Sequence, residues 1–139
     1  DERGAGVFVD GWYRSSDLVT VDEDGYVRVV DRKTDLIKSG GDWISTIELE
    51  DALCTYPGIT SAAVIGVPDD RWQERPRAYV VTSEPVDAQA VRTFLAERFA
   101  RFWVPDELVV LDAMPLTSVG KTDKNRLRAR AAEERPVAP

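Results

Sequence analysis

The sequence predicts an α+β fold in which helices pack on a small mixed β-sheet, with a β-hairpin in front of it. Short apolar or β-branched runs alternate with amphipathic helical segments, and no segment repeats another. A chain of 139 residues with 43% hydrophobic residues is also long enough to bury one ordinary core.

The hairpin is predicted in the first part of the chain. Leu18 to Thr20 lead into a turn that contains Asp24-Gly25, a strong hairpin signal, and residues 26–30 form a β-branched strand. The five polar residues 31–35 then interrupt two apolar segments, which is typical of a joint between two parts of a fold.

The first helix is predicted to begin at Ser45, because its hydroxyl can accept the N–H of Glu48 in a capping box. Ile44 and Leu49 have the spacing of a hydrophobic staple, and Pro57-Gly58 ends the helix. Four residues at helical spacing are predicted to face a core: Leu49, Ala52, Leu53 and Tyr56.

Two neighbouring strands are predicted at 61–67 and 77–82, with a charged loop over 68–76 between them. A further strand is predicted at 107–111, and a basic helix from about 123 to 134.

A second helix lies between these strands. Asp87 can cap it and Pro105 ends it. Its apolar stripe is predicted to face the core: Val91, Phe94, Leu95, Phe99 and Phe102.

Composition excludes several classes of function. The formal charge of -7 and the isoelectric point near 4.6 argue against wholesale binding to nucleic acid or to an anionic membrane, because the averaged field repels both. Between Lys121 and Arg130 basic residues outnumber acidic ones, and this basic run fits either a phosphate-facing patch or a solvated helix face. The single cysteine, Cys54, forms no internal disulfide, and the absence of histidine excludes His-based triads and His metal ligands. Without a membrane span or a signal-peptide pattern, a cytoplasmic protein is expected.

The segment 115–127, PLTSVGKTDKNRL, centres on Lys121. Gly120 leaves the adjoining backbone unscreened, so that a ligand oxygen can approach both backbone N–H groups and the ammonium. The alternative is a tight turn into the last helix, capped by Thr122 or Asp123, with Lys121 solvated. A P-loop is excluded, because a proline stands where its first glycine is required.

Three separated strings match one family in order and spacing: GWYRSSD at 11–17, DRKTDLIKSGGDWISTIELE at 31–50 and PLTSVGKTDKNRLR at 115–128. Together they resemble the C-terminal part of the adenylate-forming enzymes: acyl-CoA synthetases, luciferases and the adenylation domains of peptide synthetases. GGDWIS with IELE is most similar to the medium- and long-chain fatty-acyl-CoA ligases. Two positions depart from the family pattern, since Ser16 and Gln73 stand where glycine is common.

The resemblance implies a division of the chain. In the family a large N-terminal domain holds the acyl pocket and the phosphate loop, and a small C-terminal domain swings over it as a lid. Residues 1–31 match the end of the large domain, 32–35 the hinge and 36–130 the lid, and 131–139 are expected to form a frayed tail. The chain is therefore expected to be a fragment that is inactive by itself.

The resemblance also implies roles in the first half-reaction, in which a carboxylate attacks the α-phosphorus of ATP. Lys121 matches the lid lysine that neutralises the two anions. Asp17 matches the acid that binds both ribose hydroxyls, and Arg32 matches the arginine that contacts ribose and phosphate. Mg²⁺ is expected as well, bound mainly by the N-terminal domain.

In the second half-reaction coenzyme A attacks the acyl-adenylate, and the lid of the family rotates between the two steps. Lys38 matches the second-step lysine, and the pivot falls on Lys33 and Thr34. By resemblance, four residues contact the pantetheine arm: Ser39, Gly40, Gly41 and Trp43.

Each of these residues also has a purely structural interpretation. Asp17 fits a turn acid before a strand, and Arg32 fits a surface ion pair of little energetic weight. Lys38 fits the edge of a hairpin, where a charge opposes aggregation, and Trp43 fits a core aromatic.

We therefore expect the lid of an ATP-dependent ligase that joins a fatty or related aliphatic carboxylate to coenzyme A and releases AMP and pyrophosphate. Its partners would be its own N-terminal domain, the carboxylate and coenzyme A, with no nucleic acid and no transmembrane segment. The alternatives are a ligase that hands the acyl group to the pantetheine of a carrier protein and a non-catalytic, free-standing binding module. A phosphate- or RNA-binding domain built on residues 121–130 is poorly supported, because aromatic residues do not interleave with the charges.

Overall fold

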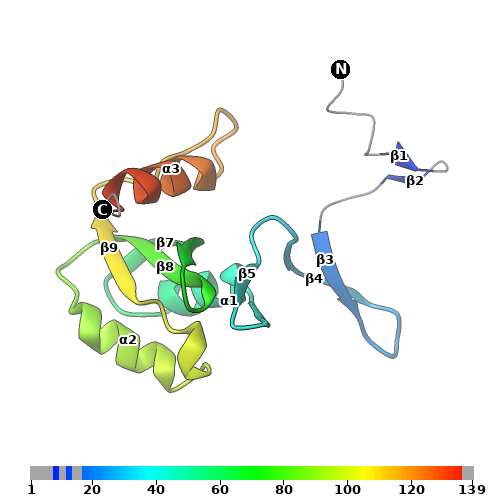
Figure 1. The fold of residues 1–139 in the computed structure, drawn as a ribbon, viewed down its shortest axis with the longest axis horizontal. Helices are drawn as coiled ribbons and strands as arrows, with labels where there is room; N and C mark the ends of the chain where they lie inside the picture. Colours follow the sequence, from blue (N-terminus) through cyan, green and yellow to red (C-terminus); the bar gives the residue numbers. More distant parts are fainter. Residues whose placement is uncertain (1–7, 10–11, 14–16, 136–139) are drawn as a thin grey trace.

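The computed structural model describes residues 8–9, 12–13 and 17–135. Two antiparallel strand pairs come first: β1 (Phe8–Val9) with β2 (Trp12–Tyr13), and β3 (Asp17–Val21) with β4 (Val27–Arg32). The predicted hairpin is confirmed in β3 and β4, and it projects away from the rest of the fold (Figure 1). Its turn is held by the Asp22 carboxylate, which accepts the backbone N–H groups of Asp24 and Tyr26.

The centre of the described fold is a five-stranded mixed sheet. Its strands are β5 (Ile37–Ser39), β6 (Asp42–Ile44), β7 (Ile59–Asp69), β8 (Gln73–Thr82) and β9 (Glu107–Leu111). The order is β6-β5-β8-β7, and β9 runs parallel to β8 whereas the other pairs are antiparallel. The predicted mixed sheet is thus confirmed.

The prediction of a charged loop over 68–76 is wrong, because β7 and β8 extend through most of it as a long two-stranded ribbon. Charged side chains can alternate toward solvent along such a ribbon, so polar composition does not exclude strand. Only 70–72 form the turn, where the Asp69 carboxylate accepts the N–H groups of Arg71 and Trp72, which lowers the pKa of Asp69. Gln73 completes the reversal with a φ of +76°, a left-handed conformation that favours glycine.

Three α-helices complete the described fold: α1 (Thr46–Cys54), α2 (Ala88–Ala96) and α3 (Lys124–Glu134). The predicted caps are confirmed, since Ser45 Oγ accepts the N–H of Glu48 (3.3 Å) and the Asp87 carboxylate accepts the N–H of Gln89 (3.0 Å).

The predicted length of the second helix is wrong. α2 ends at Ala96, and a 3-10 turn, η2 (Arg101–Trp103), follows after an extended residue at Ala100. Phe99 and Phe102 therefore lie outside the helix, although both still pack against the core. Apolar spacing does not distinguish one long helix from a helix and a turn that bury the same residues.

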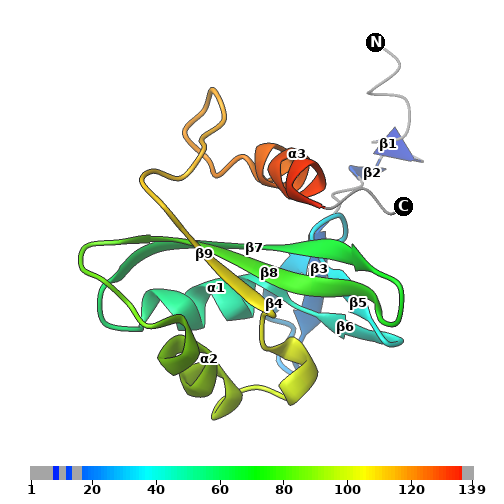
Figure 2. The same ribbon diagram turned by 60° about the vertical axis from the view of Figure 1, so that its left-hand side comes forward.

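Helices cover both faces of the sheet. Figure 2 shows α1 and α2 on one face and α3 on the other. The first core includes the residues that α1 and α2 bury: Leu49, Leu53, Val91 and Leu95. The second lies under α3 and includes Ile65, Tyr79, Leu111, Leu127 and Ala131. No helix in the described ranges is long and apolar enough to cross a membrane.

The predicted frayed tail begins too early. Ala131 is buried beside Leu127, one helical turn earlier, and α3 continues to Glu134. Residues 131–134 are ordered because this apolar stripe packs on the sheet. The rest of the predicted tail, 136–139, lies outside the described residues.

Candidate functional site

Lys121 lies in a tight loop between β9 and α3. The Thr117 N–H donates to the Lys121 carbonyl (2.6 Å), and the Lys121 N–H donates to Thr117 Oγ1 (3.2 Å). Gly120 has a φ of +81° and donates its N–H to the Thr117 carbonyl (3.0 Å). The Lys121 side chain is exposed, and within the described ranges its ammonium has no ion-pair partner. The loop therefore holds the backbone of Lys121 firmly and leaves its charge free for a ligand.

The cap of the helix that follows is Asp123. Its carboxylate accepts the N–H of Arg126 (3.2 Å), and its own N–H donates to the Pro115 carbonyl (2.8 Å). The sequence left Thr122 and Asp123 as candidates for the N-cap of α3. Asp123 is the N-cap, whereas Thr122 forms an antiparallel β-bridge with Leu116.

Asp17 and Arg32 face each other across the β3–β4 ladder. They are register partners, and the Arg32 guanidinium lies 3.8 Å from the Asp17 carboxylate. Both side chains are exposed, so the ion pair contributes little to stability and either group can turn to a ligand.

The predicted hinge residues form a turn. The Arg32 carbonyl accepts the N–H groups of Asp35 (2.9 Å) and Leu36 (3.1 Å), which leaves Lys33 and Thr34 exposed between them. In the part of the chain that is described, no hydrogen bond or ion pair joins Lys33 or Thr34 to another element.

Lys38 and Trp43 are register partners in the β5–β6 hairpin. The Lys38 ammonium lies 5.5 Å from the Trp43 ring centroid, within reach of a cation–π contact. Trp43 is 55% exposed, so the interpretation as a core aromatic is wrong. β5 lies between β6 and β8, so Lys38 does not sit on an edge strand.

Ser39, by contrast, points inward. Its side chain is 2% exposed and its hydroxyl lies 3.5 Å from the Arg75 guanidinium. Gly40 and Gly41 turn the hairpin with φ of +60° and +91°. The Gly40 N–H donates to the Trp72 carbonyl (2.8 Å), which brings the β7–β8 turn against this hairpin.

A cationic cleft of about 840 Å³ opens beside Trp72. Three arginines from separate elements line it: Arg71 in the turn, Arg92 on α2 and Arg101 in η2. Arg75 also lines it, but Asp106 already neutralises this guanidinium through two contacts (2.8 and 2.9 Å). Asp69 lines the cleft as well, but the charges of Arg71, Arg92 and Arg101 exceed it, so the cleft offers net positive charge next to the glycine turn.

The family model for the AMP-binding enzyme C-terminal domain matches residues 48–121, which is more than half of the chain. The chain belongs to this family.

Relatives of this AMP-binding C-terminal domain act on different acids. 3-Methylmercaptopropionyl-CoA ligase from Ruegeria lacuscaerulensis is 44% identical over 122 residues, which are 86% of this chain and 22% of that protein. Long-chain-fatty-acid–CoA ligase from Thermus thermophilus is 44% identical over 121 residues, again 86% and 22%. o-Succinylbenzoate CoA synthetase from Bacillus subtilis, solved with its acyl-adenylate intermediate, has a TM-score of 0.85 at 35% identity and matches 89% of this chain and 26% of that one. The chain thus spans about a fifth to a quarter of the length of the curated relatives that it matches, from 22% to 27%.

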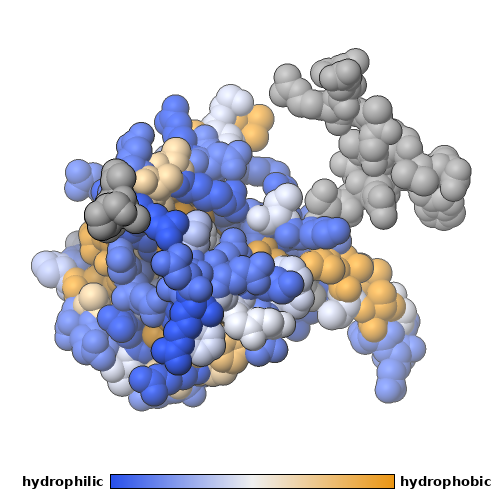
Figure 3. Space-filling model, viewed as in Figure 1, coloured by the Kyte–Doolittle hydropathy of each residue, from blue (hydrophilic) through white to orange (hydrophobic). Residues whose placement is uncertain are grey.

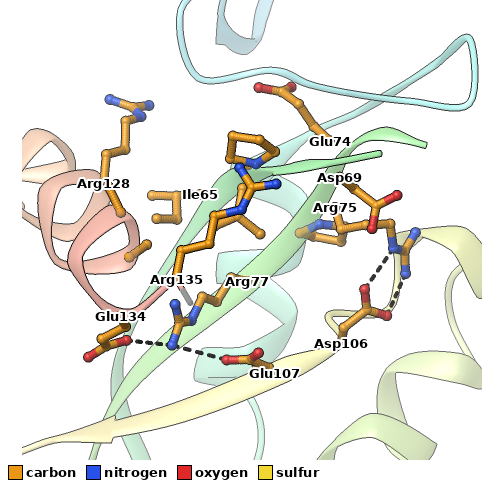
Figure 4. Close-up of a pocket in the computed structure, with 16 residues that line it drawn as sticks. Ile65, Asp69, Glu74, Arg75, Arg77, Asp106, Glu107, Arg128, Glu134 and Arg135 are labelled. Carbon is orange, nitrogen blue, oxygen red and sulfur yellow. Dashed lines mark hydrogen bonds and ion pairs between the residues drawn. The ribbon is translucent and has the colours of Figure 1, made fainter. Parts of the chain in front are cut away.

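A second groove of this C-terminal domain lies between α3 and the β7–β8 ribbon (Figure 4). Its central charge is already paired, because Arg77 contacts Glu134 (2.6 Å) and Glu107 (3.0 Å). This groove is therefore less suited to a charged ligand than the cleft beside Trp72.

Sequence reasoning missed Trp72, Arg92 and Arg101, since no local pattern groups them. In the described ranges no three acids or cysteines are arranged to hold a metal ion, and we assign no Mg²⁺ ligand among them.

Proposed function

We propose that the chain is the C-terminal lid of an ATP-dependent ligase that converts an aliphatic carboxylate, such as a fatty acid, into its coenzyme A thioester through an acyl-adenylate. Membership of the AMP-binding C-terminal family and the 44% identity to a long-chain fatty-acid ligase support this proposal. The observation that carries it is the exposed Lys121 on a loop of fixed backbone.

In the first half-reaction Lys121 would enter the active site and neutralise the two anions that meet there, the carboxylate and the α-phosphate. A cation whose backbone is already fixed does this at low reorganisation cost. Asp17 and Arg32 would hold the nucleotide at the edge of the N-terminal domain, and their position opposite each other in β3 and β4 supports a shared ligand.

In the second half-reaction Lys38 and Trp43 would face the active site, and the arm of coenzyme A would pass over Gly40 and Gly41. The β5–β6 hairpin and the Lys121 loop lie at well-separated places on the lid in both views (Figures 1 and 2). One lid can therefore present Lys121 or Lys38, but not both, to one active site. This supports alternation of the lid about Lys33 and Thr34.

The β3–β4 hairpin would belong to the large N-terminal domain rather than to the lid. All five residues of β3 are exposed, and so are several large apolar side chains of the hairpin: Leu18, Val19, Val21, Tyr26, Val27 and Val29. Figure 3 shows this apolar patch over the hairpin. A contiguous apolar surface of this kind marks a protein interface, which supports a domain boundary near Asp31.

The cleft beside Trp72 would hold the nucleotide phosphates of coenzyme A. Arginine forks suit phosphate oxygens, and Arg71, Arg92 and Arg101 line the cleft next to the glycine turn over which the pantetheine arm would run. A carrier protein presents the same arm without that nucleotide. The position of these arginines therefore favours free coenzyme A as the acceptor.

The first test compares Lys121→Ala with Arg126→Ala in the full-length protein. Arg126 is an exposed base on the same segment and serves as the matched control. Lys121→Ala is expected to reduce carboxylate-dependent exchange of pyrophosphate into ATP by about 10²- to 10³-fold, the usual effect of removing one transition-state charge partner. Thioester formation from preformed acyl-adenylate is expected to survive. Unchanged exchange would mean that Lys121 is only a solvated turn residue.

The acceptor is tested with coenzyme A and pantetheine in parallel. Arg92→Glu with Arg101→Glu is expected to raise the KM for coenzyme A and to leave the KM for pantetheine unchanged. If both acceptors are equally poor in the unaltered enzyme and a loaded carrier protein is good, the carrier-protein ligase is the correct function.

A further inference from the structure

A series of buried and half-buried polar contacts links the strand before the hinge to the start of α3. Asp31, in β4, is 1% exposed, and its carboxylate accepts the N–H (2.7 Å) and the hydroxyl (2.9 Å) of Thr46 in α1. The Thr46 hydroxyl accepts in turn from the ammonium of Lys124 (3.0 Å). The same ammonium pairs with Glu50 (2.7 Å), whose carboxylate also accepts the N–H of Val64 (2.9 Å).

The charged groups in this series of contacts offset one another's cost of burial. A buried carboxylate without partners is costly, and Asp31 is offset by the positive end of α1 together with the Thr46 hydroxyl. The Lys124 ammonium pairs directly with Glu50 and reaches Asp31 only through the Thr46 hydroxyl, so Lys124 is the one cation within this group of contacts. Burial raises the pKa of Glu50, Lys124 opposes this rise and Asp31 adds to it.

These contacts cross the predicted pivot. Asp31 precedes residues 32–35, whereas Thr46 and Lys124 belong to the lid. One helical turn further along α3, Arg128 pairs with Asp35 (2.6 Å), the last residue of the predicted hinge. A rotation of the lid would break the Asp31 contacts with Thr46, but it would leave the Lys124–Glu50 pair intact because both partners lie in the lid.

We propose that Thr46 and Lys124 are positioning residues that form, with Asp31, a clasp across the hinge, and that this clasp holds the lid in the orientation seen here. The proposal rests on the proposed function, since it takes residues 32–35 as the pivot of a moving lid. Opening the clasp costs the two hydrogen bonds that Asp31 accepts from Thr46, so the lid is expected to favour this orientation over others.

The experiment measures the distance between the hairpin and the lid in the 139-residue chain by pulsed electron paramagnetic resonance. Cys54, the single cysteine, is exposed at the end of α1 and takes one spin label. Glu23→Cys, in the exposed hairpin turn, takes the other. The unaltered clasp is expected to give one narrow distance distribution.

Thr46→Val is the decisive variant, because it removes the hydroxyl between Asp31 and Lys124 and keeps the branched shape and the backbone N–H. The fraction of molecules whose label-to-label distance lies outside the main peak is expected to increase about tenfold. This is the change produced by the loss of one hydrogen bond to a charged group. Lys124→Met is expected to have a larger effect, whereas Arg126→Met removes a 72% exposed charge from the same helix and is expected to have none.

An unchanged distance distribution in Thr46→Val would overturn the clasp. If Lys124→Met fails to fold by circular dichroism, Thr46→Val still decides, and Lys124→Arg is expected to restore the narrow peak. The readout is a distance and not a rate, so it is separate from the pyrophosphate-exchange test of Lys121. Loss of exchange in Lys121→Ala with an unaffected distance in Thr46→Val would leave the proposed function standing and remove the clasp.

Discussion

Replacing Gly40 by alanine is expected to move Trp72. A Cβ on Gly40 would lie 2.9 Å from Cε3 and 3.2 Å from Cζ3 of the indole, which is closer than carbon atoms approach. The backbone cannot yield easily, because the Gly40 N–H donates to the Trp72 carbonyl at 2.8 Å. The ring is 40% exposed and can swing toward solvent. The indole would then leave its place in the lining of the cationic cleft.

The energetic cost of Gly40→Ala follows from two contributions. Its φ of +60° lies in the left-handed region, which costs a non-glycine residue about 1–2 kcal/mol. Displacement of the ring would also weaken the stacking of Arg71, now 5.0 Å from the ring centroid, by about 0.5–1 kcal/mol. The free energy of unfolding should therefore fall by roughly 2 kcal/mol.

Gly41→Ala is the matched control. Its φ is +91° and no atom lies within 4 Å of the added Cβ, so only backbone strain of about 1–3 kcal/mol is expected. Urea unfolding should thus show similar losses for both variants. In the full-length ligase, Gly40→Ala should slow thioester formation more than Gly41→Ala and should spare pyrophosphate exchange. Equal thioester rates in the two variants would refute a role for Trp72 in the acceptor site.

Three further predictions concern the described residues. Arg75→Lys should lower the free energy of unfolding by about 2–3 kcal/mol in urea, because it loses the paired contacts to Asp106 and those to two backbone carbonyls; an effect no larger than that of Arg71→Lys would contradict this. Burial raises the pKa of Glu50, so its contribution to stability should be present below the unfolded value of 4.5 and be lost as the pH rises through the folded pKa. As the pH rises through that window, the free energy of unfolding of Glu50→Gln should accordingly increase relative to that of the unaltered chain. A difference that does not change with pH would exclude the raised pKa of Glu50. Partial desolvation of the exposed Cys54 also raises the pKa of its thiol, so iodoacetamide at pH 8 should alkylate it more slowly than glutathione, and equal rates would contradict this.

Local signals in the sequence predicted the parts of the fold that depend on neighbouring residues. The caps at Ser45 and Asp87 and the Asp24-Gly25 turn are formed by residues a few positions apart, so their chemistry is readable directly. Residues 68–76 were mistaken for a charged loop, because the ends of β7 and β8 are stabilised by pairing with each other across the turn at 70–72 rather than by apolar content.

The candidate site divides in the same way. Lys121 and the glycine turn lie in continuous motifs, which the resemblance could identify. Arg92 and Arg101 meet Trp72 only because α2 and η2 fold back beside the β7–β8 turn, and no spacing along the chain indicates that meeting.

Asp31 shows most clearly why sequence alone falls short. It stands in a run of five polar residues, which favours an exposed joint, yet the structure buries it. The burial is tolerated because α1 directs its N-terminus at the carboxylate and Lys124 brings a cation from the far end of the chain. Lys124 begins α3 three residues after Lys121, so the helix that presents the proposed catalytic loop also contacts the hinge. A substitution at the start of α3 is therefore expected to alter lid orientation even when it leaves Lys121 in place.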